Sequence, residues 1–254
     1  MDWTAQSDAT KSEGLRERKK RQLRQKLTDT ATAMFLERGF EAVRVAEIAA
    51  ACDVSEKTVF NYFPTKESLV LDHPDALMDV LRTELADPEV SPVDAVLRIL
   101  THELKALTSW LAGHDDPAEA GAQLARFNNM IQTTPALRAH QRDTTEQLAA
   151  AAVTVLADRV GMRAEDPEPQ IAAAALLGLW QIQFGSLSQH LDGKLTPQQV
   201  KRAVTTDVQR AARLLEAGLS TFATDRRVSA RSTGRTSTPR TGAATGPKQA
   251  RKRL

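Results

Sequence analysis

The 254-residue sequence has a single cysteine, few aromatic residues (4%) and no long apolar stretch. Because Cys52 has no second cysteine to pair with, the chain cannot form an intrachain disulfide, which fits a reducing compartment. A small buried core residue is a commoner role for such a cysteine than a redox sensor. The sequence lacks a run of about 18 apolar residues and a secretory signal, so we expect a cytoplasmic protein that does not enter a membrane.

Motifs of common enzymes are missing as well. The sequence contains no glycine-rich phosphate loop, no Gly-x-Ser-x-Gly elbow and no His-Glu-x-x-His pair. The histidines are far apart and lack metal-ligand spacing with the cysteine; they are His73, His102, His114, His140 and His190. These absences predict a protein without catalytic activity, metal or other cofactor.

Charge is unevenly distributed along the chain, although the net charge is only +2. Residues 1–26 hold 8 Lys and Arg against 4 Asp and Glu, residues 72–223 hold 13 against 20, and residues 224–254 hold 9 against 1. A charge run on its own is usually a solvated surface. Next to a DNA-reading segment, however, a basic run is the electrostatic footprint of phosphate binding.

Residues 39–66 contain two short apolar patterns separated by a tight break. The first has i, i+3, i+4 spacing and comprises Val45, Ile48 and Ala49. The second comprises Val54, Val59 and Phe63. Ser55 is placed to cap the second helix, and Asp53 tolerates a left-handed backbone better than most residues. The segment is therefore predicted to form a helix-turn-helix.

The second helix of this motif carries side chains that suit a DNA major groove. Off its apolar face lie Glu56, Lys57, Thr58, Phe60, Asn61 and Tyr62. A charged donor, a hydroxyl, an amide and aromatic edges can all contact base edges. Three aromatic residues within four positions are equally compatible with a plain hydrophobic core, and the residues alone leave both interpretations open.

The motifs over residues 27–71 resemble the N-terminal DNA-binding domain of TetR-family transcriptional regulators. The matching residues are Gly39-Phe40, Ile48-Ala49, Val54-Ser55, Thr58, Phe60-Asn61-Tyr62-Phe63 and Lys66-Glu67-Ser68-Leu69. The sequence departs from the family pattern in three places. Arg44 replaces a Thr or Ser, Asp53 replaces a turn glycine, and Phe60 replaces a tyrosine and so lacks its hydroxyl.

The resemblance implies roles for individual residues. The expected readers of base edges are Lys57, Thr58 and Asn61, with Phe60 on the same DNA-facing helix. The expected phosphate contacts are Arg44, Tyr62 and Lys66. Basic residues near the start of the chain could bind phosphate or reach into a minor groove; they are Arg18, Lys19, Lys20, Arg21 and Arg24.

Helical signals cover the chain, and no segment alternates as a strand would. A first helix is expected over 15–38, and Thr65 should cap a fourth helix that Pro74 kinks or divides. Five pairs of a capping residue and proline then begin five helices within 91–222: Ser91-Pro92, Asp116-Pro117, Thr134-Pro135, Asp166-Pro167 and Thr196-Pro197. Gly113, Gly161 and Gly193 should end three of them.

The last two predicted helices carry extensive apolar surface. The helix over about 168–190 is apolar on most sides, which a small core cannot hide, and the helix over 197–222 has an apolar stripe. In the TetR family the corresponding helices pair between subunits, so the resemblance implies a homodimer. A monomeric bundle core is the alternative.

We therefore predict an all-α chain with four parts: a disordered N-terminus (1–14), a three-helix helix-turn-helix DNA-binding domain (15–71), a helical ligand-binding and dimerisation domain (72–223), and a basic disordered tail (224–254). The resemblance implies a small-molecule pocket in the middle helices. Its candidate lining is Trp110, Phe127, Met130, Ile131, Trp180 and Phe184, with Asn128, Gln181 or Gln183 for polar contacts. Few basic residues occur among them, which favours an apolar or weakly polar effector.

The predicted function is a dimeric regulator, most simply a repressor, that binds a near-palindromic operator in double-stranded DNA and is released by a small-molecule effector. Two alternatives remain at this stage. One is an architectural, nucleoid-associated DNA-binding protein without an effector, which the basic tail favours slightly. The other is an enzyme with an appended DNA-binding domain, which no residue visibly supports.

Overall fold

The computed structural model describes residues 14–71, 74–191 and 194–218, and the secondary structure in these ranges is helical throughout. The elements are α1 (Leu15–Arg38), α2 (Val45–Ala51), α3 (Glu56–Tyr62), the 3-10 helix η1 (Glu67–Leu69), α4 (Pro74–Ala86), α5 (Pro92–Ala112), α6 (Pro117–Thr133), α7 (Pro135–Val160), α8 (Pro167–His190) and α9 (Pro197–Gly218). The all-α prediction is confirmed. The segments predicted to be disordered lie almost entirely outside the described residues.

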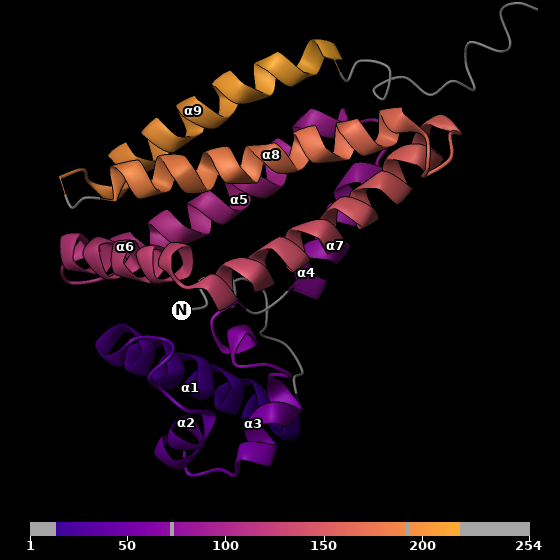
Figure 1. Cartoon of the computed structure of the whole chain (residues 1–254). Coiled ribbons are helices and arrows are strands. Elements are labelled where there is room, and N and C mark those ends of the chain that lie inside the picture. The colour runs from indigo at the N-terminus through magenta and orange to yellow at the C-terminus, as the bar shows by residue number, and fades with distance from the viewer. Residues whose placement is uncertain (1–13, 72–73, 192–193, 219–254) are drawn as a thin grey trace, which may run out of the picture.

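The helices form a small head and a larger body. Helices α1, α2 and α3 lie together at one end of the molecule, and α8 and α9 run side by side at the opposite end (Figure 1). In the head, α1 supplies the buried side chains Leu27, Ala31 and Phe35, and its observed bounds match the predicted 15–38. The head is thus built around one face of α1.

The turn between α2 and α3 has the left-handed residue and the serine cap that the sequence predicts. Asp53 adopts a left-handed backbone with φ of 58°. The Ser55 side chain caps α3, because its Oγ accepts a hydrogen bond of 3.1 Å from the amide of Thr58. Cys52 is only 3% exposed and packs in the core, as predicted. These contacts orient α3 relative to α2.

The predicted fourth helix is divided, with η1 on one side of the break and α4 on the other. The Thr65 hydroxyl does cap a helix start, since it accepts a hydrogen bond of 3.1 Å from the Ser68 amide. That start belongs to the short η1 and not to a long α-helix, which corrects the expectation. The long helix begins at Pro74, whose fixed φ suits a first helical position and whose ring cannot continue a preceding helix.

Each of the helices α5 to α9 begins at the predicted proline. Ser91 and Asp116 accept hydrogen bonds from backbone amides as caps, and the hydroxyl of Thr196 accepts a longer bond of 3.3 Å from the amide of Gln199. Side-chain capping was wrongly expected at Thr134 and Asp166.

The physical reasons at these two positions differ. Thr134 joins α6 directly to α7 and ends one helix while starting the next. Asp166 instead accepts a hydrogen bond of 2.9 Å from the Arg163 amide. Gly113 and Gly161 end α5 and α7 as predicted, while Gly193 lies outside the described residues.

Helix α8 is the most apolar element, but this chain buries only part of it. Its inner face packs against α7 and α9 and also meets α5. On the other side, Ile171 and Ile182 are 68% and 42% exposed. By length and composition α8 could pass for a membrane span, with mean hydropathy 1.3 over its best window, although core helices of soluble proteins pass the same test.

The loop between α4 and α5 is held by one arginine of α7. The guanidinium of Arg159 donates to four backbone carbonyls at the end of α4 and in this loop, at 2.6 to 3.4 Å; they belong to Leu85, Asp87, Pro88 and Val90. The Asp87 carbonyl also accepts a hydrogen bond of 3.3 Å from the Val90 amide, but the loop has no regular secondary structure to satisfy the carbonyls of Pro88 and Val90. Arg159 therefore replaces the missing backbone partners and ties α7 to the start of α5.

Replacing this arginine should destabilise the body. We expect Arg159→Ala to lower the free energy of unfolding by about 2–3 kcal/mol, because several charge-assisted hydrogen bonds are lost and the carbonyls lose their partner. Arg142→Ala, on the exposed side of the same helix, is the control and should change it by less than about 0.5 kcal/mol. Urea denaturation of both variants measures the difference, and equal stabilities would show that the loop does not need the arginine.

Candidate nucleic-acid interface

Helix α3 has one buried face and one exposed face. Val59 and Phe63 are completely buried beneath it. The exposed side chains of α3 are Glu56, Lys57, Phe60 and Asn61, with Phe60 45% exposed. The aromatic residues thus divide: Phe63 is core, Tyr62 is half-buried and Phe60 faces outward. A helix that presents a cation, an amide and an aromatic ring from a rigid support suits a major groove.

An arginine of α1 holds the end of α3 in place. Arg24 Nη1 donates a hydrogen bond of 3.3 Å to the backbone carbonyl of Tyr62. The same guanidinium lies 4.7 Å from the centre of the Phe63 ring. Arg24, grouped above with the basic residues available for phosphate, therefore has a structural task that orients α3.

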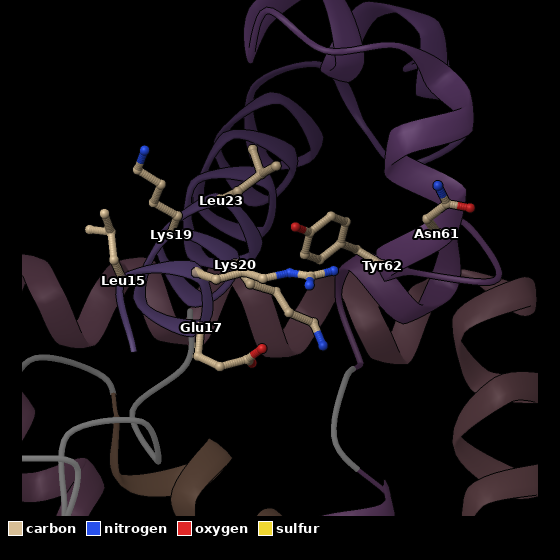
Figure 2. Close-up of a pocket in the computed structure, with 8 residues that line it drawn as sticks. Leu15, Glu17, Lys19, Lys20, Leu23, Asn61 and Tyr62 are labelled. Atoms are coloured by element: carbon tan, nitrogen blue, oxygen red, sulfur yellow. The ribbon is translucent and has the colours of Figure 1, made fainter. Parts of the chain in front are cut away.

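The start of α1 and the end of α3 enclose a hollow on the surface. It is lined by Leu15, Arg16, Glu17, Lys19, Lys20, Leu23, Asn61 and Tyr62. In Figure 2, the ring of Tyr62 turns toward α1 while Asn61 lies on the side of α3 farther from α1. Three cations against one carboxylate make the hollow basic. Sequence reasoning listed Lys19 and Lys20 as phosphate contacts and counted Arg16 only within the basic run of residues 1–26; the approach of α1 to α3 brings Arg16 into this group.

Arg44 precedes α2 and extends into solvent. Its side chain is 84% exposed and makes no capping hydrogen bond. The cap comes instead from Glu47, whose carboxylate accepts hydrogen bonds from the Arg44 amide at 2.8 Å and from Arg38 Nη2 at 2.7 Å. These two donors, the amide first, hold the pKa of Glu47 below its usual value. The carboxylate of Glu47, in the first turn of α2, therefore satisfies the amide at the start of the helix, which the Arg44 side chain does not.

Two predicted DNA contacts already have partners within the protein. The Thr58 hydroxyl lies 2.9 Å from the Ser55 hydroxyl and is half-buried, so only part of its hydrogen-bonding capacity is free. The Lys66 ammonium donates to the Phe40 carbonyl at 2.5 Å and lies 4.3 Å from the centre of the Phe40 ring. Lys66 thereby joins η1 to the segment after α1, which sequence reasoning did not foresee.

Two family models match the chain. "Bacterial regulatory proteins, tetR family" matches residues 27–72, and "MftR C-terminal domain", also a TetR-family model, matches residues 104–220. The matched ranges of 46 and 117 residues together cover 163 of the 254 residues. The chain belongs to the TetR family. The resemblance found in the sequence is thus confirmed, and the chain is a DNA-binding transcriptional regulator.

Individual relatives of this TetR-family regulator are more distant. The HTH-type transcriptional regulator TcmR of Streptomyces glaucescens is 28% identical over 154 residues, which is 60% of this chain and 67% of TcmR. A similar solved structure is Thermus thermophilus FadR, a TetR-family transcriptional repressor crystallised with lauroyl-CoA, with 23% identity, 87% and 100% of the two chains covered, and a TM-score of 0.42.

A TetR regulator from Rhodococcus sp. RHA1 has 21% identity, 79% and 99% coverage, and a TM-score of 0.41. These structural likenesses are too weak to support an argument about a ligand. None of the comparisons supports the alternative of an architectural DNA-binding protein without an effector.

The residues predicted to line the effector pocket are scattered between core and surface. Phe127, Met130 and Ile131 of α6 are buried, while Trp110, Trp180 and Phe184 are half-buried. Among the polar candidates, Gln183 is buried, Asn128 is half-buried and Gln181 is exposed.

None of these candidates lines the hollow beside α3. None of them lines a second hollow along the exposed side of α5 either, whose lining is Glu89, Val90, Asp94, Leu97, Arg98, Thr101, His102 and Lys105. The predicted pocket lining thus stays a prediction.

Removing the Lys66 ammonium separates its two possible roles. Lys66→Met should lower the free energy of unfolding by about 1–3 kcal/mol, because a charge-assisted hydrogen bond to Phe40 is lost. Lys57→Met, at an exposed lysine of α3, is the matched control and should leave stability unchanged. Thermal or urea unfolding measures this effect. If Lys66 also contacts phosphate, DNA affinity should fall and its salt dependence should flatten. Unchanged stability would contradict the structural role, and an unchanged salt slope would remove Lys66 from the phosphate contacts.

Proposed function

We propose that the protein is a cytoplasmic homodimeric repressor that binds a near-palindromic operator and is released by a small-molecule effector. The observation that carries this proposal is the exposed face of α3, which is supported from below by two fully buried side chains and flanked by a basic hollow. The protein performs no catalysis in this proposal, because DNA binding and ligand binding suffice for its task.

Direct reading of sequence falls to the exposed side chains of α3. Lys57 can donate to guanine acceptors, and Asn61 can pair with adenine in a bidentate manner. Thr58 contributes through the part of its hydroxyl that Ser55 leaves free. Phe60, with its ring exposed and no hydroxyl, suits apolar contact with a thymine methyl group.

Phosphate contacts surround this reading face. Arg44 extends into solvent from the start of α2, and Tyr62 borders the basic hollow. Lys66 has two further N–H donors beyond the one directed at Phe40. We add Arg16, Lys19 and Lys20 to this set because they line the hollow next to Tyr62. The contacts would fix the register of α3 in the groove without reading bases.

The partner in the dimer would cover the outer face of α8. Small or apolar residues recur there every three or four positions: Ile171, Ala174, Gly178, Ile182 and Gly185, of which Gly178 is half-buried and the others are exposed. Such spacing lets two helices approach closely. Exposure of a long apolar stripe is unfavourable in water, so a second copy offers a physical reason for the composition of α8.

Effector binding would act through the contacts between body and head. The element η1 packs against both α1 and α7, and α1 also contacts α6. A shift of α6 or α7 around a ligand would therefore move α1 and change the spacing of the two copies of α3. The ligand weakens DNA binding only as far as it prefers the changed shape. The candidate pocket residues lie on α5, α6 and α8, and α6 and α8 both pack against α7.

Selection of bound sequences from a random DNA pool, followed by salt titration on the selected and on random DNA, tests the proposed function. We expect a near-palindrome with half-sites about 34–36 Å apart, or a multiple of that, and affinity at least about 10³-fold above random DNA. Equal affinity for both DNA samples at all salt concentrations would contradict a sequence-specific regulator.

A single substitution tests the reading face. Asn61→Ala should relax the preference at one base position of each half-site, at a cost of about 1–3 kcal/mol on the preferred base. The same substitution at the exposed Asn129 of α6 is the control and should change nothing. Binding to a set of operators with single base changes measures the preference. An equal loss on every operator would mean that Asn61 reads no base.

Another substitution tests the dimer. Ile182→Arg should convert the dimer into a monomer and abolish tight operator binding, because a buried charge without a partner is costly. Val80→Arg, at a comparably exposed apolar residue of α4, should remain dimeric. Sedimentation of both variants measures the oligomeric state. A dimeric Ile182→Arg variant would place the interface elsewhere.

A further inference from the structure

Two polar side chains of the body have hydrogen-bonding groups without a partner among the described residues. Gln183 of α8 is 5% exposed, and its side-chain amide makes no hydrogen bond in the part of the chain that the structure describes. Glu103 of α5 is half-buried, and among the described residues no Lys, Arg or His lies within 4 Å of its carboxylate. Buried amides and carboxylates are normally satisfied, so both residues require an explanation.

The two residues come together through Trp180. The indole Nε1–H of Trp180 donates a hydrogen bond of 3.1 Å to Glu103 Oε2 and thus joins α8 to α5. Gln183 follows Trp180 by three residues on α8, a spacing that places two side chains on neighbouring positions of one helix face. Three residues beyond Gln183, Ser186 donates to Asp207 of α9, so Gln183 lies on the side of α8 between the Trp180–Glu103 contact and α9. Among the described residues, neither the second oxygen of Glu103 nor the amide of Gln183 has a hydrogen-bond partner.

The charged groups around Glu103 do not neutralise it. Residues 169–189, which make up nearly all of α8, contain no charged residue. On α9, the carboxylate of Asp207 is occupied by Ser186 and Arg210. On α5 itself, Arg98 lies 3.8 Å from Glu84 and Lys105 is exposed. Burial raises the pKa of Glu103 to about 7, and the Trp180 hydrogen bond only partly opposes this.

We propose that Glu103, Trp180 and Gln183 form the polar end of the effector site and that the effector is an apolar molecule with an ammonium group. This inference rests on the proposed function, because it names the chemistry of the effector. The ammonium binds the free oxygen of Glu103 and supplies the missing positive charge. The Gln183 carbonyl accepts a second N–H, and the Trp180 ring offers its face to the cation.

Neither of the two hollows described above is lined by Glu103, Trp180 or Gln183. In this proposal a ligand enters by separating side chains of α5 and α8, and α8 also packs against α7, which contacts η1. A ligand bound here would therefore displace helices that contact the head through η1. The net negative charge of residues 72–223 additionally favours approach of a cation.

Three probes with one apolar body and different end groups test the proposal: 4-phenylbutylammonium, 4-phenylbutanol and 4-phenylbutyrate. Calorimetric titration of the full chain without DNA should show the ammonium probe binding at least about tenfold more tightly than either other probe. Because Glu103 becomes neutral below its pKa of about 7, lowering the pH from 8 to 6 should weaken binding of the ammonium probe about tenfold. Equal or tighter binding of the alcohol or carboxylate, or no binding of the ammonium at millimolar concentration, overturns the proposal.

Matched variants test whether Glu103 and Gln183 cause the preference for the ammonium probe. Glu103→Gln keeps an acceptor for Trp180 and should abolish both the preference for the ammonium and the pH dependence, whereas Glu146→Gln, at an exposed glutamate of α7, should retain both. Gln183→Leu should melt at the same or a higher temperature, because an unsatisfied buried amide is removed, yet should bind the ammonium probe at least about fivefold more weakly. A Gln183→Leu variant with unchanged affinity removes Gln183 from the site, and an unchanged preference in Glu103→Gln overturns the whole assignment.

Operator binding, measured separately in the presence of the ammonium probe, distinguishes this inference from the proposed function. Tight probe binding without release of DNA would retain the site and reject release by an effector. Specific operator binding by a protein that does not bind the probe would retain the regulator and reject the ammonium site.

Discussion

Val59 and Phe63 are completely buried against the head, and the surface offered to DNA depends on that burial. Helix α3 has seven residues, too few to be stable in water alone. Burying these two side chains contributes about 1.5–3 kcal/mol each, which exceeds what helix propensity can supply over such a length. The outward direction of Lys57 and Asn61 is therefore a consequence of what lies beneath them. Arg24 adds a hydrogen bond at the open end of the same helix.

Several basic residues of the head serve its own structure. Arg24 holds the end of α3, Lys66 bonds the Phe40 carbonyl, and Lys26 donates to the Cys52 carbonyl at 3.2 Å. Tyr62 and Cys52 lie at the ends of the short helices α3 and α2, and Phe40 lies in the turn after α1, so each cation satisfies a backbone carbonyl where regular structure leaves acceptors unpaired. Such groups cannot be assigned to phosphate from charge alone. The basic side chains near the start of α1, which are exposed, are better placed for that role.

The body, unlike the head, is held together mainly by apolar packing and not by cations that bond backbone carbonyls. Its core is dominated by leucine, alanine and valine, and most polar groups near it are satisfied locally, as the Thr108 hydroxyl is by the Leu104 carbonyl. Gln183 and the second oxygen of Glu103 depart from this pattern. Unsatisfied polar groups reduce stability, and the proposed effector would supply a partner for both.

The sequence by itself determined the helical class, the helix starts at Pro92, Pro117, Pro135, Pro167 and Pro197, the left-handed turn at Asp53 and the family. These features depend on residues within a few positions of one another: a proline restricts its own φ, and a cap reaches amides two or three residues ahead. Only the tertiary structure decided that Lys66 turns inward to Phe40, that Arg16 joins Asn61 and Tyr62 around one hollow, and that Gln183 is buried with no hydrogen-bond partner among the described residues. Those outcomes depend on helices that are distant in sequence and meet only after the core has packed, so no local pattern could reveal them.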